Sequence, residues 1–189
     1  LHPVAHSFPT RRSSDLDARE LSAIINSCSR MSHSDIAFMM CMGNSFARKR
    51  AERIYVKYRQ NIISGLKFIE KHPKICGKEY VIINAKNNVR DTIIGTLASI
   101  LSFSSVYKQG TIIIAMAYNE DKIKVSARVA GRISNPKHNL KELIESVASV
   151  LGGESGGHLN AAGCTIHKEK EGKFIDLIKR RLDLDLIKV

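Results

Sequence analysis

The residues best suited to chemistry form a glycine cluster in the last quarter of the chain. Five of the twelve glycines fall in Gly152-Gly-Glu-Ser-Gly-Gly-His-Leu-Asn-Ala-Ala-Gly163. Glycine lets a backbone approach a ligand closely and take positive φ, so that successive N–H groups converge on an oxyanion. His158 adds a donor that is charged when protonated, and Asn160 adds an amide. The cluster predicts a phosphate-binding turn. The alternative is a helix end followed by a tightly packed strand, which needs only one or two glycines.

A second group of candidate residues lies on a predicted strand at residues 122–130. There Ile123, Val125, Ala127 and Val129 alternate with Lys124, Ser126 and Arg128. Alternate residues of a strand share a face, so Ser126 and Arg128 are expected side by side. Arginine grips a phosphate through two parallel N–H bonds, which favours an anion site. The alternative for Arg128 is an ordinary surface position on a strand.

The elements that would position these residues form one mixed sheet covered by helices, an α/β (α+β) fold. Apolar periodicity from residue 79 onward predicts the order β-α-β-β-α-β-α. Asn139 is the predicted N-cap of the second helix, with Glu142 three residues later. The predicted ranges are strands 80–85, 111–118, 122–130 and 162–167, and helices 91–103, 140–151 and 172–182.

The region before this sheet reads as helical. A first helix is predicted over residues 17–31, capped by Asp17 with Glu20 three residues on, and a second over residues 35–42. Residues 45–71 keep one apolar stripe over a long helix whose other faces are basic. That basic surface is either a solvated helix face or a rim that faces phosphates. Pro73 ends the helix, which is a natural connector between domains.

The first sixteen residues show neither helical nor strand periodicity. Residues 6–16 match the translation of a common sequencing adaptor, and we therefore expect residues 1–16 to be non-native. The alternative is a disordered basic tail.

Composition narrows the classes of function. The formal net charge of +12 suggests a polyanionic partner, with nucleic acid first and an anionic membrane second. A generally basic proteome would give the same charge. No apolar run approaches the ~18 residues that a membrane span needs. The four cysteines are scattered, which argues against a zinc ribbon or a disulfide scaffold and fits the reducing cytoplasm.

Three stretches together resemble one known family. Ser155-Gly-Gly-His-Leu-Asn-Ala-Ala-Gly163 is similar to the GGGHxxAAG signature of the DHH-associated domain, the C-terminal half of DHH-superfamily phosphoesterases, with Ser155 in place of the first glycine. Lys124-Val-Ser-Ala-Arg128 resembles the family strand that carries a Ser and an Arg toward the substrate phosphate. Asp17-Ala-Arg-Glu-Leu and Asn26-Ser-Cys-Ser-Arg30 resemble the end of the catalytic domain in archaeal-type RecJ-like nucleases.

The resemblance implies a domain plan and a site. Residues 17–45 would be a remnant of the catalytic DHH domain, residues 46–78 the connecting helix and linker, and residues 79–189 the substrate-binding domain. The implied phosphate-binding residues are expected within contact range of one another, facing one shallow cleft. They are Ser126, Arg128, Ser155, Gly156, Gly157, His158 and Asn160.

The resemblance also implies a function: the half of a truncated RecJ-like exonuclease that binds single-stranded DNA or RNA, with roles in DNA repair and replication. Two divalent metals, manganese or magnesium, would be held by the missing catalytic domain, whose Asp-His-His triplet this sequence lacks. No catalytic residue, metal ligand or cofactor is therefore expected here, and the fragment alone would be inactive. Replisome proteins are a second candidate partner, and no membrane is expected.

Three alternatives remain open at this stage. One is a fragment of an oligoribonuclease or cyclic-dinucleotide phosphodiesterase, which act on small substrates. Another is a non-catalytic replisome scaffold. The most distant is an editing domain of a tRNA synthetase.

Overall fold

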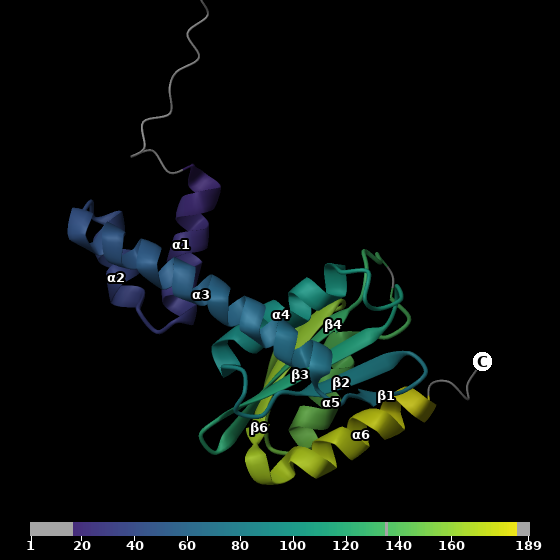
Figure 1. Cartoon of the computed structure of the whole chain (residues 1–189). Helices are drawn as coiled ribbons and strands as arrows, with labels where there is room; N and C mark the ends of the chain where they lie inside the picture. Colours follow the sequence, from purple (N-terminus) through teal and green to yellow (C-terminus); the bar gives the residue numbers. More distant parts are fainter. Residues whose placement is uncertain (1–16, 135, 185–189) are drawn as a thin grey trace, which may run out of the picture. The chain divides into compact units, whose positions relative to one another are not determined.

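The computed structural model describes residues 17–134 and 136–184, drawn in colour in Figure 1. The predicted non-native segment, residues 1–16, lies outside this range. The chain divides between Arg59 and Gln60 into two compact units, and the boundary falls inside the long helix α3 (Ser45–Lys71). No helix in the described ranges combines the length and the apolar content needed to cross a bilayer.

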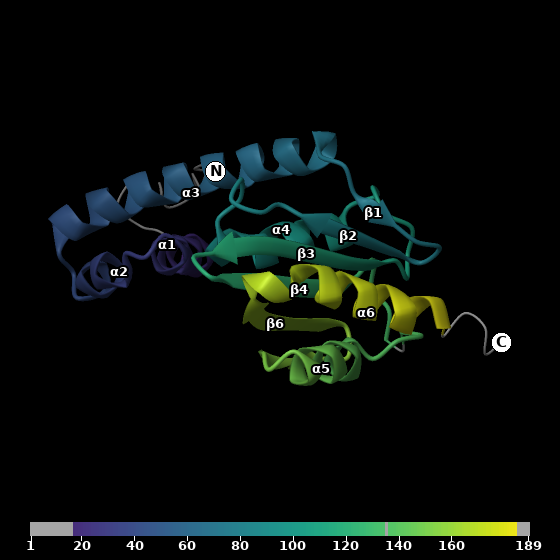
Figure 2. The same ribbon diagram turned by 90° about the horizontal axis from the view of Figure 1, so that it is seen from below.

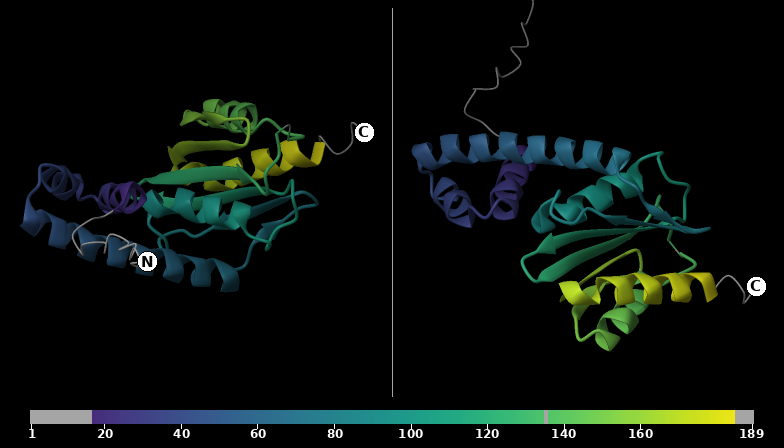
Figure 3. Two further views of the ribbon diagram at one scale, coloured as in Figure 1. Left: turned by 90° about the horizontal axis from the view of Figure 1, so that it is seen from above. Right: turned by 60° about the horizontal axis from the view of Figure 1, so that its bottom comes forward.

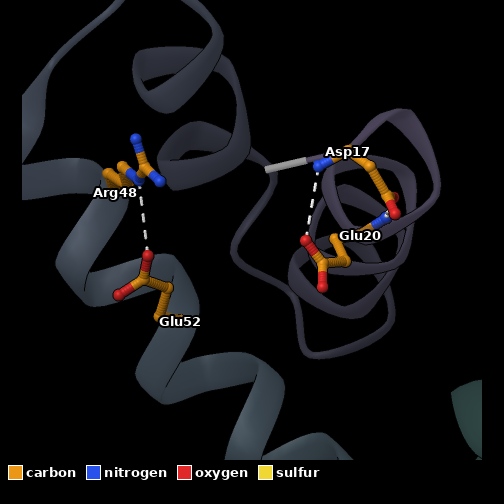
Figure 4. A network of polar contacts seen from close by, with 4 residues as sticks. All are labelled: Asp17, Glu20, Arg48 and Glu52. Atoms are coloured by element: carbon orange, nitrogen blue, oxygen red, sulfur yellow. Dashed lines mark hydrogen bonds and ion pairs between the residues drawn. The ribbon is translucent and has the colours of Figure 1, made fainter. Parts of the chain in front are cut away.

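The N-terminal unit contains α1 (Ala18–Arg30), α2 (Ser34–Cys41) and the first part of α3. Helix α1 starts at Ala18 because Asp17 Oδ1 accepts from the N–H of Glu20 at 2.8 Å, while Glu20 Oε2 accepts from the N–H of Asp17 at 3.3 Å. Figure 4 shows this reciprocal cap and the exposed ion pair of Arg48 with Glu52. The predicted helices and the Asp17 cap are confirmed.

The C-terminal unit is built on a six-stranded sheet in the order β1-β2-β3-β4-β6-β5. Figures 1 and 2 label these strands except β5. Strands β2 and β3 are parallel, joined through the helix between them, and every other neighbouring pair is antiparallel. The strands are β1 (Ile75–Cys76), β2 (Tyr80–Asn84), β3 (Ile112–Asn119), β4 (Lys122–Val129), β5 (Glu154–His158) and β6 (Ala161–His167).

Helices cover both faces of this sheet. Helices α5 (Leu140–Val150) and α6 (Glu171–Leu184) lie on one face, and α4 (Asp91–Phe103) lies over β3 and β4 on the other (Figure 3). Asn139 starts α5 as predicted, because its side chain accepts from the N–H groups of Lys141 and Glu142. A short 3-10 turn, Lys168–Lys170, precedes α6.

Strand alternation divides β4 between the two faces. Ile123, Val125, Ala127 and Val129 are buried in the core under α5 and α6, together with Phe174 of α6. Burying these side chains stabilises the sheet by roughly 1.5–3 kcal/mol for each large one. The intervening residues of β4 therefore face α4, which leaves that face to carry the candidate site.

The predicted order of elements is confirmed, with two strands added. Strand β1 is a two-residue pair at one edge of the sheet. Strand β5 is a correction, because the glycine segment predicted as a turn is extended and pairs with β6 along its length. The chain reverses at Leu159 and Asn160, a two-residue hairpin loop.

The four cysteines provide a test of these placements. Cys41 and Cys76 are exposed, whereas Cys28 of α1 and Cys164 of β6 are buried. Burial raises the pKa of the Cys28 thiol, and it raises the pKa of the Cys164 thiol to about 12. Because the thiolate is the reactive form, an Ellman titration of the native protein should show two fast and two slow thiols. Rapid reaction of all four would contradict the described packing of α1 and β6.

Candidate functional site

The candidate site begins on the α4-facing side of β4. Lys124 is exposed, Ser126 is buried and Arg128 is half-buried along this strand. Ser126 lies under α4 where that helix carries Gly95, since a Cβ placed on Gly95 would be 3.5 Å from Ser126 Oγ. A glycine inside a helix costs about 1 kcal/mol relative to alanine, so Gly95 is a feature that the helix retains at some cost. A Cβ at this distance would make an ordinary van der Waals contact, so α4 could also pack on β4 with alanine at this position.

Two strands continue this face outward from β4. In the register, Ser126 pairs with Gly163 of β6, which pairs with Gly156 of β5. Two residues further along β4, Arg128 pairs with Ala161 of β6, which pairs with His158 of β5. Directly opposed residues lie on the same face of a sheet, so Gly156 and His158 share a face with Ser126 and Arg128. The sheet therefore brings these four predicted residues to one face, on which Ser126 is covered by α4.

The sequence predicted that the residues of the glycine segment lie within contact range of Ser126 and Arg128, and the sheet places them further apart. Strand β6 separates β4 from β5, so the Cα atoms of Arg128 and His158 are about two strand spacings, or roughly 10 Å, apart. The sheet surface between them is formed by Ala161, Gly163 and Gly156, which have small side chains or none. We call this surface the floor of the site. A ligand on this floor would lie between the strand that carries Arg128 and the strand that carries His158.

The glycines of β5 have different roles. A Cβ on Gly156 would meet no described atom within 4 Å, so this position leaves the floor open. Gly157 has φ +149, and a Cβ there would lie 2.4 Å from Ala162 Cα. The predicted nest of converging N–H groups is not formed, because successive N–H groups of an extended strand point in opposite directions. Gly157 serves the close pairing of β5 with β6.

Ser155 and Gly157 belong to the opposite register row. Ser155 pairs with Cys164, whose side chain lies in the core under α5 and α6. The exposed Ser155 is therefore not brought to the face that carries Ser126 and Arg128. The sequence could not show this, because glycines conceal the alternation along β5.

Arg128 is oriented by the backbone around it. Its Nη1 donates to the carbonyl oxygen of Ala127 at 2.7 Å and to that of Ala162 at 3.4 Å. These bonds hold the planar guanidinium at the junction of β4 and β6, where it supplies a fixed positive charge at any physiological pH. Arg128 is thus an oriented cationic group on this face.

Asn160 lies beside Arg128, in the loop between β5 and β6. Its Nδ2 donates to the carbonyl oxygen of Ile133 at 2.8 Å, and its own backbone carbonyl oxygen accepts from the N–H of Val129. Its Oδ1 is buried and has no hydrogen-bond partner in the described part of the chain. Buried acceptors are nearly always satisfied in folded proteins, so this atom marks a place for a donor.

Metal binding finds no support in the described ranges. No group of three or more His, Cys, Asp or Glu side chains gathers there in a way that could hold an ion. His158 stands on an open strand without carboxylates around it in the register. The described residues thus do not supply the ligands of a two-metal centre.

Two features beside the candidate site were not predicted from the sequence. One is Gly95, for which a glycine inside a predicted helix was the available signal. The other is the exposed ring of Phe103 at the end of α4, for which the sequence carries no signal, because an aromatic residue at a helix end usually joins the core.

The C-terminal part of the chain matches a known protein family. The family profile described as DHHA1 domain matches residues 74–183. A search of curated protein sequences finds no match.

Solved structures share the fold at low sequence identity. RecJ from Thermus thermophilus in complex with Mg²⁺ aligns with a TM-score of 0.65 and 16% identity, over 86% of this chain and 24% of that chain. An exonuclease RecJ bound to manganese aligns with a TM-score of 0.61 and 14% identity, over 86% of this chain and 39% of that chain. CDC45 from Entamoeba histolytica aligns with a TM-score of 0.53 and 11% identity, over 84% of this chain and 36% of that chain. The chain thus spans well under half the length of each of these proteins.

Proposed function

Because the chain belongs to the DHHA1 domain family, we propose that its C-terminal unit binds single-stranded DNA or RNA as the substrate-holding half of a RecJ-like exonuclease. The observation that carries the proposal is the shared face of β4, β6 and β5. It combines the fixed charge of Arg128, a floor of glycine and alanine, and His158 on the far side.

The chemistry of this face suits a phosphate backbone. Arg128 offers a planar fork of donors that matches phosphate oxygens, and exposed Lys124 adds a second cation on the same side of β4. The small residues of β6 and Gly156 let a strand approach the sheet without obstruction. The net charge of +12 favours a partner with many phosphates, which is the main source of affinity for nucleic acids.

The activity of a complete protein is a further part of the proposal. Cleavage would use two divalent ions, manganese or magnesium, held by a catalytic domain that the described residues do not contain. Likeness of the fold to RecJ supports a role in repair or replication, and likeness to CDC45 supports contacts with replisome proteins. All four cysteines are free thiols, which supports a cytoplasmic location.

The proposal is tested by fluorescence anisotropy with a labelled oligonucleotide about 12 nucleotides long, since single-strand sites cover several nucleotides. The wild-type chain should bind the single strand more tightly than the matching duplex and much more tightly than a dinucleotide. Equal affinity for the dinucleotide would instead favour an enzyme of small substrates. No binding to any of the three would overturn the proposed function.

A further inference from the structure

A cavity of about 490 Å³ opens beside Arg128, on the same side of the sheet as the proposed strand-binding face. The end of α4 forms one wall, the loop after β4 a second, and the β5–β6 turn a third. The residues that matter below are Phe103, Arg128, Arg132 and Asn160. Its volume lies within the range of about 300–1,000 Å³ that is usual for small-ligand pockets.

Asn160 gives this cavity a defined polarity. Because Nδ2 already donates to the carbonyl oxygen of Ile133, the orientation of the amide is fixed and Oδ1 is the atom left over. That oxygen is buried, has no partner among the described residues, and can only accept a hydrogen bond. An occupant that reached this oxygen could satisfy it only with an N–H or O–H donor, and not with an acceptor.

Phe103 gives the cavity a stacking surface. The side chain is 67% exposed at the end of α4, which is unusual for a phenylalanine. An exposed aromatic ring beside arginines is the arrangement that single-strand binding proteins use, with bases on the ring and phosphates on the cations. Here Phe103 lines the cavity together with Arg128 and Arg132.

We propose that this cavity holds one unpaired nucleobase of the bound strand, with its ring against Phe103 and an amino group donating to Asn160 Oδ1. This inference rests on the proposed function and adds base preference to it. Cytosine, adenine and guanine carry exocyclic amino groups. Uracil and thymine offer only a ring N–H between two carbonyl oxygens, which face the Asn160 acceptor unfavourably. Asn160 is therefore a specificity-determining residue.

Base preference is tested by comparing oligo-dC with oligo-dU, which differ in the amino group and not in ring size. The wild-type chain should bind oligo-dC about fivefold more tightly, the effect expected of one hydrogen bond. Asn160→Ala should bring the ratio of the two affinities to about one. Because the ratio is internal to each protein, it remains informative if the substitution also weakens the β5–β6 turn.

Stacking is tested separately with a matched pair of substitutions. Phe103→Ala should weaken binding of oligo-dC about tenfold, in line with stacking contributions measured by alanine substitution. Val106→Ala is the control, because Val106 is equally exposed and does not line the cavity. Phe103 is exposed, so its removal should leave the fold intact.

The outcomes separate the two proposals. Equal affinity for oligo-dC and oligo-dU, or wild-type binding by Phe103→Ala, would overturn the base pocket while leaving strand binding in place. Failure of the wild-type chain to bind either oligonucleotide would overturn the proposed function, and the base pocket with it.

Discussion

Gly156→Val is expected to weaken binding of single-stranded DNA by about tenfold or more, equivalent to ~1.4 kcal/mol, while the melting temperature stays near that of the wild type. A Cβ at this position meets no described atom within 4 Å, so the fold has room for the side chain. Valine is also a good strand former. The added methyl groups would instead stand on the floor between Arg128 and His158, where the phosphate backbone is proposed to lie.

Gly157→Val provides the contrast on the next residue. Its Cβ would lie 2.5 Å from the carbonyl oxygen of Ala161, and φ +149 is a conformation that side chains rarely adopt. This variant should lose the pairing of β5 with β6 and melt several degrees lower. Gly172→Val, which adds the same side chain in open space on α6, is the control for both variants.

Thermal melts and anisotropy on the three valine variants separate binding from stability. A Gly156→Val protein that binds as well as wild type would show that the floor is not the binding surface. A Gly156→Val protein that melts as early as Gly157→Val would show that both glycines serve only the packing of β5.

Arg128→Ala is expected to cost about 1.5–3 kcal/mol of binding free energy, the range for hydrogen bonds to a charged group. The loss should be larger than that from Lys173→Ala, which removes the same charge from an exposed site on α6, across the sheet. Arg128→Lys should recover only part of the affinity, because lysine keeps the charge and loses the planar fork.

Stability has to be followed in the same series. Arg128 donates to the carbonyl oxygens of Ala127 and Ala162, so the alanine variant also loses bonds that join β4 to β6. A melt at each step distinguishes lost contacts to the ligand from a loosened sheet. Equal affinities of Arg128→Ala and Lys173→Ala, with both folded, would remove Arg128 from the site.

Much of the fold could be predicted because its signals are local. The caps at Asp17 and Asn139 mark helix starts within a few residues of sequence, and alternation along β4 separates a core face from a site face. Strand β5 could not be predicted in this way. Its residues, Glu-Ser-Gly-Gly-His, include no strand-forming side chain, and only pairing with β6 makes them extended.

The sequence predicts which residues the candidate site contains, but it predicts their positions relative to one another less well. Alternation is enough to place Ser126 and Arg128 on one face of β4, since it depends on a single strand. The placement of Gly156 and His158 depends on the register across β6, which no local pattern encodes. For the same reason the sequence could not show that Ser155 lies on the other face, or that a side chain at Gly157 would collide with Ala162.

The most direct measurement is the salt dependence of single-stranded DNA binding by the wild-type chain and by Arg128→Ala. Each phosphate neutralised on a single strand contributes about −0.7 to the slope of log affinity against log salt concentration. The wild type should show a clearly negative slope, and Arg128→Ala should reduce its magnitude by about one such contact, ~0.7. Lys173→Ala should leave the slope unchanged. A flat wild-type slope, or identical slopes for wild type and Arg128→Ala, would contradict phosphate binding on this face of the sheet.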